Sequence, residues 1–168
     1  MIFSFSDDVL NDIRTPNNDP LVVNVNISNH FVGRVLVDNE SLTNMLSYET
    51  FNKMNIPLEE LKLIQSPLVG FTGNVLNPKG VISFLVTVGE KPCWVTIFVN
   101  FLVVKMLGTY NTILRRPTQC ALKAVVSIPH MKMKFPTPCG MGEVKGNPSN
   151  SWRMVHDFFE TCKEDHAH

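Results

Sequence analysis

A mainly β fold is what the sequence predicts, and three observations lead to this prediction. The chain has 168 residues, of which 44% are hydrophobic and 18% are charged, a size and balance that suit one globular domain with a substantial core. Its apolar residues gather in short segments that alternate with polar residues or are rich in β-branched side chains, as in strands. Helical spacing occurs only in a few short stretches, so strands should dominate.

The first two strands form a predicted hairpin. A polar lead-in over residues 1–19 ends in a turn-rich segment that marks a domain edge. Residues 21–27 then alternate apolar and polar at period 2, which indicates a half-buried strand. A turn at residues 28–30 leads into a second strand over residues 31–37. Asp38 follows directly where this second strand ends.

Short helices are predicted in the middle and late parts of the chain. Ser41 is a candidate N-cap for a helix whose apolar residues continue at helical spacing as far as Met54. A second short helix is expected over residues 58–63. Pro117 can open another helix at its first turn, continuing through Val125.

The remaining apolar segments predict strands and define the extent of the domain. They cover residues 67–70, 81–88, 94–99, 101–104, 110–114 and 131–135. Glycine, proline, asparagine and serine accumulate from residue 136 onward, so order is expected to fade there. The sequence therefore predicts a lead-in at residues 1–19, a folded domain at 20–138 and a flexible tail at 139–168.

Charge and cysteine content argue against several classes of function. The formal net charge is zero, and the basic last third lacks the interleaved aromatic residues that base stacking needs, so nucleic acid is not an expected partner. We see no signal peptide and no apolar run of about 20 residues, so we expect an intracellular, cytoplasmic protein without a membrane span. Free thiols are expected at four scattered positions, Cys93, Cys120, Cys139 and Cys162.

No cofactor and no metal site are predicted. Ligand types suited to zinc gather near the C-terminus at His156, Cys162, His166 and His168. Their spacing matches no closed zinc module, so adventitious metal binding is the expected limit. The glycines do not follow the spacing of a phosphate-binding loop either.

Asp38 carries the strongest functional prediction. An apolar strand ending at Val37 runs straight into this lone acid, and Asn39, Glu40 and Ser41 follow. An aspartic protease presents its catalytic carboxylate in this way. Taken alone, the same aspartate could equally cap the helix expected after it, since aspartate side chains bond readily to nearby backbone amides.

Further segments recur together with this one in the order of a known family. They are residues 5–8, 18–23, 34–39, 67–73, 101–104, 110–114, 116–118, 121–127 and 131–137. Together they resemble the protease region of plant gypsy-type retrotransposon Gag-Pol polyproteins, and the resemblance covers residues 5–145. Single segments are weak markers, whereas this order and spacing together are specific.

The resemblance implies a retropepsin-like acid protease half-barrel with one or two short helices. Two chains would pair as a homodimer, and each would contribute one catalytic aspartate, here Asp38. Two carboxylates held close share a proton, so one can take a proton from water while the other polarises the peptide carbonyl. The implied function is that of a hydrolase, an aspartic-type endopeptidase acting on a peptide or polyprotein substrate without a covalent intermediate.

The resemblance also assigns supporting roles around this carboxylate. The active-site turn would comprise Asn39, Glu40 and Ser41. The substrate-binding flap would lie near residues 71–80, entered through Gly70, Phe71, Thr72 and Gly73, with Gly73 and Gly80 as flexible points. The active-site loop would rest on Ile113, Leu114 and Arg115.

Two residues depart from the family pattern. Glu40 stands at the glycine position of the Asp-x-Gly turn, and Arg115 stands at a glycine position beside the active-site loop. The glutamate adds bulk and negative charge beside the dyad, so the turn geometry is expected to suffer. Because the two residues have opposite charge and lie on elements expected to be neighbours, one hypothesis is a compensating ion pair, and the other is independent decay.

These departures leave two functions open. The first is an active aspartic endopeptidase of a retrotransposon polyprotein. The second is a catalytically inactive remnant, a pseudoenzyme that serves as a dimerisation or peptide-binding module.

Overall fold

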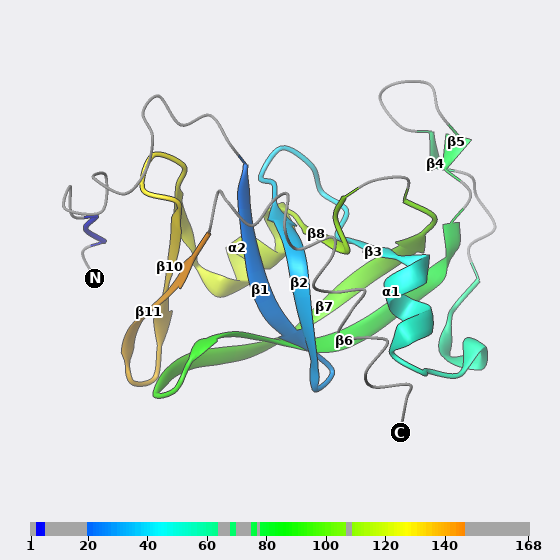
Figure 1. The fold of residues 1–168 in the computed structure, drawn as a ribbon, viewed down its shortest axis with the longest axis horizontal. Coiled ribbons are helices and arrows are strands. Elements are labelled where there is room, and N and C mark those ends of the chain that lie inside the picture. Colours follow the sequence, from blue (N-terminus) through cyan, green and yellow to red (C-terminus); the bar gives the residue numbers. More distant parts are fainter. Residues whose placement is uncertain are drawn as a thin grey trace.

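A computed structural model describes residues 3–5, 20–63, 68–69, 75–76, 78–106 and 109–146. The strands are β1 (Leu21–Ile27), β2 (His30–Val37), β3 (Met45–Ser47), β4 (Leu68–Val69), β5 (Val75–Leu76), β6 (Pro78–Glu90), β7 (Cys93–Val104), β8 (Thr112–Leu114), β9 (Val125–Ser127), β10 (Lys132–Thr137) and β11 (Gly140–Lys145). The helices are α1 (Tyr48–Lys53), the 3-10 turn η2 (Leu58–Glu60) and α2 (Arg116–Leu122). The mainly β prediction is confirmed (Figure 1).

A closed barrel forms the centre of the molecule, with its strands in the order β1-β2-β8-β3-β7-β6. Most neighbours are antiparallel, but β2 pairs with β8 and β3 pairs with β7 in parallel. The barrel closes where Asn26 and Ile27 of β1 pair with Thr87 and Val86 of β6. Figure 1 shows a separate sheet, β9 to β11, at one end of the barrel, while α1 lies toward the other end.

The predicted hairpins are confirmed in register and turn. In the β1–β2 hairpin, Leu21 pairs with Val37, and Ser28 and Asn29 form the turn with φ of 49° and 64°. Two successive residues with positive φ are typical of the tight turn whose twist matches its flanking strands. The β6–β7 hairpin is longer than expected, because residues 101–104 continue β7 rather than forming another strand.

The core follows the alternation of these strands. Along β6, Ile82, Phe84, Val86 and Val88 point inward and are buried, whereas the intervening side chains are more exposed. Phe101 of β7 is fully buried opposite them. Burying such side chains stabilises the fold by roughly 1.5–3 kcal/mol each relative to exposure.

The helix predicted from Ser41 to Met54 was wrong in its first half. Met45 and Leu46 pair with β8 on one side and with β7 on the other, so they form strand β3. Helix α1 begins only after Ser47, whose hydroxyl caps it by accepting a hydrogen bond from the Thr50 amide at 3.0 Å. Pairing with two neighbouring strands outweighed the helical spacing of the apolar residues, since local propensity is a weak prior. The helix opened by Pro117 likewise ends earlier than predicted, before β9.

The expected domain end at residue 138 falls inside a β-hairpin. Strand β11 pairs with β10 from Lys132↔Lys145 to Thr137↔Gly140, so the described part of the predicted tail, up to residue 146, is ordered. Two of the glycines that suggested a tail, Gly142 and Gly146, serve close packing instead, whereas Gly140 lies in the turn with a φ of 122°. A Cβ added to Gly142 would lie 2.6 Å from a ring carbon of Phe135.

Two predicted segments, the polar lead-in and the C-terminal histidine cluster, fall largely on residues that the structure does not describe. Residues 6–19 and 147–168, which include the lead-in and the His156 cluster, lie outside the described residues. Within the described part, no helix combines the length and apolar character needed to span a membrane.

Candidate active site

Asp38 lies where the sequence prediction placed it, at the carboxyl end of β2. The parallel pairing of β2 with β8 sets Val37 opposite Leu114, and the Asp38 amide donates a hydrogen bond to the Leu114 carbonyl at 3.0 Å. Its side chain keeps 31% exposure. The carboxylate is thus held on a rigid strand pair while staying accessible to solvent.

The turn after Asp38 supports the carboxylate through a backbone amide. Glu40 donates its N–H to Asp38 Oδ1 at 3.1 Å. Asn39 and Glu40 both have exposed side chains, and Glu40 does not adopt a positive φ. A glutamate at this position is therefore compatible with the turn of one chain, contrary to the expectation that the turn geometry would suffer.

Arg115 faces Asp38 rather than Glu40. Its Nε lies 3.9 Å from Asp38 Oδ2, so the ion pair that Arg115 makes in the described part of the chain is with the candidate catalytic residue. That distance is too long for a hydrogen bond. The hypothesis of a compensating Glu40–Arg115 pair was therefore wrong. The backbone of Arg115 is extended, with φ of −110°, and it precedes helix α2 as its N-cap residue.

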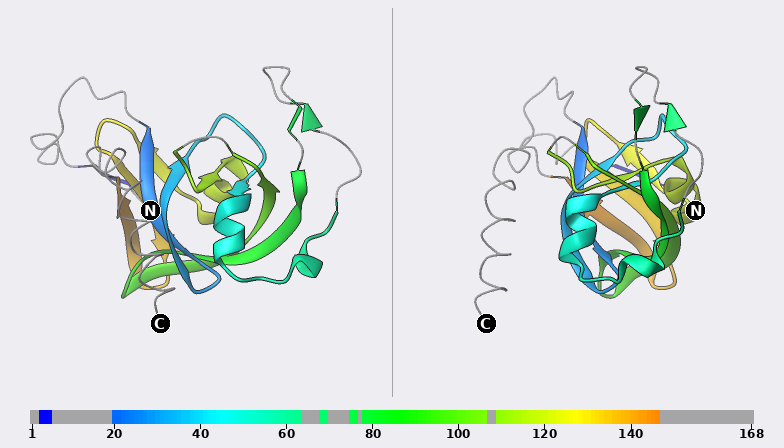
Figure 2. Two further views of the ribbon diagram at one scale, coloured as in Figure 1. Left: turned by 45° about the vertical axis from the view of Figure 1, so that its right-hand side comes forward. Right: turned by 90° about the vertical axis from the view of Figure 1, so that its right-hand side faces the viewer.

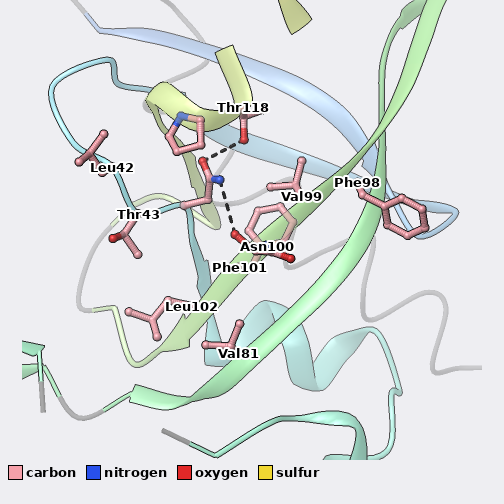
Figure 3. Close-up of a pocket in the computed structure, with 11 residues that line it drawn as sticks. Leu42, Thr43, Val81, Phe98, Val99, Asn100, Phe101, Leu102 and Thr118 are labelled. Carbon is pink, nitrogen blue, oxygen red and sulfur yellow. Dashed lines mark hydrogen bonds between the residues drawn. The ribbon is translucent and has the colours of Figure 1, made fainter. Parts of the chain in front are cut away.

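The Asn44 side chain connects the loop after Asp38 to α2 and β7 by hydrogen bonds. This role was not predicted from the sequence. Its Oδ1 accepts hydrogen bonds from the Arg115 amide at 2.7 Å and from the Thr118 hydroxyl at 2.9 Å. Its Nδ2 donates to the Asn100 carbonyl at 3.5 Å. Figure 3 shows the bonds to Thr118 and Asn100 as dashed lines beside a surface pocket of about 390 Å³.

Ser41 contributes to the same connection through its backbone. Its carbonyl accepts a hydrogen bond from the Arg116 amide at 3.1 Å. Together with the bonds of Asn44, this contact joins the middle and the C-terminal end of the loop over residues 38–44 to the start of α2. Ser41 is therefore part of the loop support rather than the predicted helix cap.

A second buried amide fixes β8 against β2. Asn111 is 5% exposed and accepts a hydrogen bond from the Arg34 guanidinium at 3.0 Å, while its Nδ2 donates to the Gly33 carbonyl at 2.9 Å. Burial lowers the pKa of the Arg34 guanidinium below its usual value, and the nearby Glu49 carboxylate partly counters this shift. The network holds the two strands that present Asp38.

The predicted loop-supporting residues Ile113 and Leu114 lie on β8, directly beside β2. Ile113 pairs with Leu36, and the buried Leu114 supplies the carbonyl that binds the Asp38 amide. Both therefore contact the strand that carries Asp38 at its end. The parallel β2–β8 pairing explains why residues so distant in sequence meet here.

The predicted flap lies mostly outside the described residues. This applies to Gly70, Phe71, Thr72 and Gly73. Strands β4 and β5 on either side pair antiparallel, with Leu68↔Leu76 and Val69↔Val75, as the two arms of a hairpin would. In Figures 1 and 2 these strands and the loop after β2 both lie at the upper end of the barrel.

Gly80, predicted as a flexible point of the flap, lies near the start of β6. A Cβ at this position would lie 2.8 Å from the Lys62 carbonyl oxygen, and Val81 exchanges backbone hydrogen bonds with Lys62. Gly80 is thus needed for a close backbone approach at the start of β6.

Within the described ranges, no group of three or more His, Cys, Asp or Glu side chains gathers as a metal site would require. Asp38 is the sole aspartate among these residues. The described part of one chain therefore contributes one aspartate carboxylate, that of Asp38.

Comparison with known proteins identifies the fold. No family model and no curated protein sequence matches the chain. Among solved structures, the retroviral protease-like domain of Ddi1 from Leishmania major matches with a TM-score of 0.58 and 14% identity, covering 79% of this chain and 96% of that one. The chain has a retropepsin-like fold. At this identity the likeness establishes the fold alone, and it confirms the predicted architecture.

Two further structural matches are weaker. EIAV protease in complex with the inhibitor HBY-793 matches with a TM-score of 0.48 and 21% identity, over 68% of this chain and 99% of that one. A retropepsin-like aspartic protease from Rickettsia conorii matches with a TM-score of 0.46 and 14% identity, over 73% and 80%.

Proposed function

We propose that this chain is the aspartic endopeptidase domain of a retrotransposon polyprotein, acting as a homodimer through Asp38 of each protomer. The observation that carries the proposal is the setting of Asp38 in a retropepsin-like fold. Its carboxylate follows a rigid parallel strand pair, accepts the Glu40 amide at 3.1 Å and stays accessible. The described part holds a single aspartate, and in the proposed dimer the second aspartate of the dyad comes from the partner chain.

Such a dyad would hydrolyse a peptide by acid–base catalysis. Two adjacent carboxylates cannot both ionise easily, so they hold one proton between them. The ionised carboxylate takes a proton from a water molecule, which attacks the peptide carbonyl, while the protonated one donates a hydrogen bond to the carbonyl oxygen. The Glu40 amide would orient its own Asp38 during this exchange.

A second function, a dimerisation or peptide-binding module without proteolysis, is favoured by one specific contact. The Arg115 guanidinium lies 3.9 Å from the Asp38 carboxylate. The guanidinium thus lies beside the carboxylate that a second chain would have to approach, at a position where the resemblance implies glycine. Glu40 would add a further negative charge from each chain. Under this alternative the fold persists, and the substitutions at the two glycine positions abolish cleavage.

A peptide-cleavage assay at mildly acidic pH separates the two functions. The full chain would be tested on a denatured protein substrate together with the Asp38→Asn, Glu40→Gly and Arg115→Gly variants. Activity in the natural sequence that disappears with Asp38→Asn supports the endopeptidase. Glu59→Gln is the matched control, because Glu59 is an exposed carboxylate on η2.

The remaining outcomes are equally decisive. Activity that emerges only with Glu40→Gly, Arg115→Gly or both supports the inactive module and identifies the substitution responsible. Activity that survives Asp38→Asn would refute both functions, because neither assigns catalysis to another residue.

A further inference from the structure

Two cysteines far apart in sequence meet at the tips of two hairpins. Cys93 is the first residue of β7, directly after the β6–β7 turn, and Cys139 lies in the turn between β10 and β11. They are 46 positions apart, yet the Cys93 Sγ donates to the Cys139 carbonyl oxygen at 3.6 Å. In Figures 1 and 2 the two hairpin tips lie side by side, at the end of the barrel opposite the loop after β2.

The two hairpins contact each other through their backbones, which fixes the position of Cys93. A Cβ added to Gly142 of β11 would lie 2.8 Å from the Cys93 carbonyl oxygen, and one added to Gly89 of β6 would lie 2.6 Å from the same atom. Phe135 of β10 is fully buried and lies against both glycines. The proximity of the Cys93 side chain to the Cys139 backbone therefore follows from tight packing rather than from a chance approach of two loops.

The separation is within reach of a covalent bond. A carbonyl oxygen lies about 2.4 Å from its own Cα, so the Cα of Cys139 is within about 6 Å of the Cys93 sulfur, given the 3.6 Å contact. In a disulfide the sulfurs are about 2.05 Å apart and each lies about 2.8 Å from its own Cα, so the sulfur of one cysteine is within about 5 Å of the Cα of the other. Because Cys139 is exposed in a two-residue turn, rotation of its side chain and a small shift of the turn can close the gap.

We infer that Cys93 and Cys139 form a reversible disulfide that joins the barrel to the C-terminal sheet. The oxidant is a peroxide. The exposed Cys139 thiolate attacks one peroxide oxygen, the O–O bond breaks, and a sulfenic acid and water result. The Cys93 thiolate then attacks the sulfenic sulfur and expels hydroxide, which takes up a proton. Overall, two thiols and one hydrogen peroxide give one disulfide and two waters.

Thiols reverse the reaction by exchange. One glutathione thiolate attacks the disulfide to give a mixed disulfide, and a second releases glutathione disulfide and both protein thiols. The bond therefore responds to the balance between peroxide and thiol. Cys93 and Cys139 are not part of the candidate active site, so the device is separate from the proposed catalysis.

Closing the loop of residues 93–139 should stabilise the folded chain. A cross-link of this span restricts the unfolded ensemble, and we expect oxidation to raise Tm by on the order of 10 °C. Cys120 provides the contrast. It is an exposed thiol on α2, and the described residues place no second cysteine beside it.

Peptide mapping of the full chain tests the inference. The chain would be treated with hydrogen peroxide near stoichiometry, alkylated without reduction and digested with trypsin. We expect a cross-linked pair of peptides spanning residues 80–105 and 135–145, lighter by two hydrogens than the sum of the free peptides. The rise in Tm should appear with the cross-link and disappear after dithiothreitol treatment.

Serine variants provide the controls. Cys93→Ser or Cys139→Ser should abolish both the cross-linked peptide and the rise in Tm, whereas Cys120→Ser should keep both. If Cys93→Ser perturbs folding, Cys139→Ser still tests the inference, because its exposed position tolerates serine. Stable sulfenic or sulfinic acid at Cys139 without the linked peptide, or linkage only between separate chains, would overturn it.

Discussion

Replacing Asn44 with alanine should destabilise the fold more than any change to the exposed turn beside it. Asn44 is 5% exposed, and its Oδ1 is the acceptor for two donors, the Arg115 amide at 2.7 Å and the Thr118 hydroxyl at 2.9 Å. The alanine variant leaves both donors without this acceptor. Each buried group left unsatisfied costs about 1–3 kcal/mol.

The expected loss of stability for Asn44→Ala is smaller than the sum of the largest costs of two unsatisfied donors. The Thr118 hydroxyl can rotate toward another acceptor, whereas the Arg115 amide is fixed by the backbone. The third bond of Asn44, to the Asn100 carbonyl, is 3.5 Å long and should contribute little. We therefore expect a loss of about 2–4 kcal/mol in the free energy of unfolding.

Urea denaturation of the full chain measures this loss, and Asn39→Ala is the matched control. Asn39 is an exposed asparagine in the same loop, so its substitution should change stability by less than about 0.5 kcal/mol. With a slope near 2 kcal/mol per molar, Asn44→Ala should lower the midpoint by about 1–2 M. Equal midpoints for the two variants would refute the role assigned to Asn44.

Three other substitutions probe the scaffold by the same assay. Ser47→Ala removes the cap of α1 and should cost about 1 kcal/mol; no loss would mean that water replaces the hydroxyl. Gly142→Ala places a Cβ 2.6 Å from the Phe135 ring and should cost about 1–3 kcal/mol, whereas an unchanged urea midpoint would show that the hairpin relaxes freely. Asn111→Ala removes an acceptor of the buried Arg34 guanidinium and should cost at least about 2 kcal/mol; a smaller loss would indicate that water satisfies it.

The hairpins were predictable because the residues that determine a strand and its turn are close together in sequence. Residues 21–27 alternate at period 2, and the adjoining turn residues Ser28 and Asn29 tolerate positive φ, so both the strand bounds and the turn follow from neighbouring residues. For the β6–β7 hairpin the two strands were predicted but not their full length, because β6 begins at Pro78 and residues 101–104 continue β7. Along β6 the buried face carries apolar residues, whereas Trp94 and Phe98 of β7 are apolar yet exposed.

Strand β3 was not predictable in this way, because its partners are distant. Met45 and Leu46 carry apolar side chains that fit a helix as well as a strand. What decides between them is pairing with Leu102 and Val103 on one side and with Ile113 and Thr112 on the other. A short segment inserted between two strands takes their conformation whatever its own periodicity.

In the candidate site, too, features that depend on neighbouring residues were predicted, whereas features that depend on distant partners were not. The position of Asp38 at the end of an apolar strand is a local feature, and the accompanying family-like segments led from it to the prediction of a catalytic carboxylate. Asn44 and Asn111 were not found, because their importance lies in partners 71 and 77 positions away. An asparagine that is buried in the fold looks, in sequence, like any polar residue of a turn.

Glu40 and Arg115 distinguish the constraints that act within one chain from those that would act between two. Glu40 is exposed without a positive φ, and Arg115 has an extended backbone, so one chain accommodates both residues without backbone strain. A need for glycine at these positions would therefore arise from the approach of a second chain. In the proposed dimer, the two turns would gather the carboxylates of Asp38 and Glu40 from both protomers, and like charges about 4 Å apart repel by roughly 4 kcal/mol at an effective dielectric constant of 20.

If Glu40 disfavours the approach of a second chain, its replacement should change self-association without changing the stability of the separate chain. Glu40→Gly should change the unfolding free energy of the separate chain by less than about 1 kcal/mol, because the exposed side chain makes no contact that the turn requires. The same substitution should tighten self-association, measured by sedimentation at matched concentrations, and Glu59→Gln should leave it unchanged. If Glu40→Gly instead destabilises the separate chain and leaves association unaltered, the glutamate belongs to the fold of one chain, and the argument from a second copy fails.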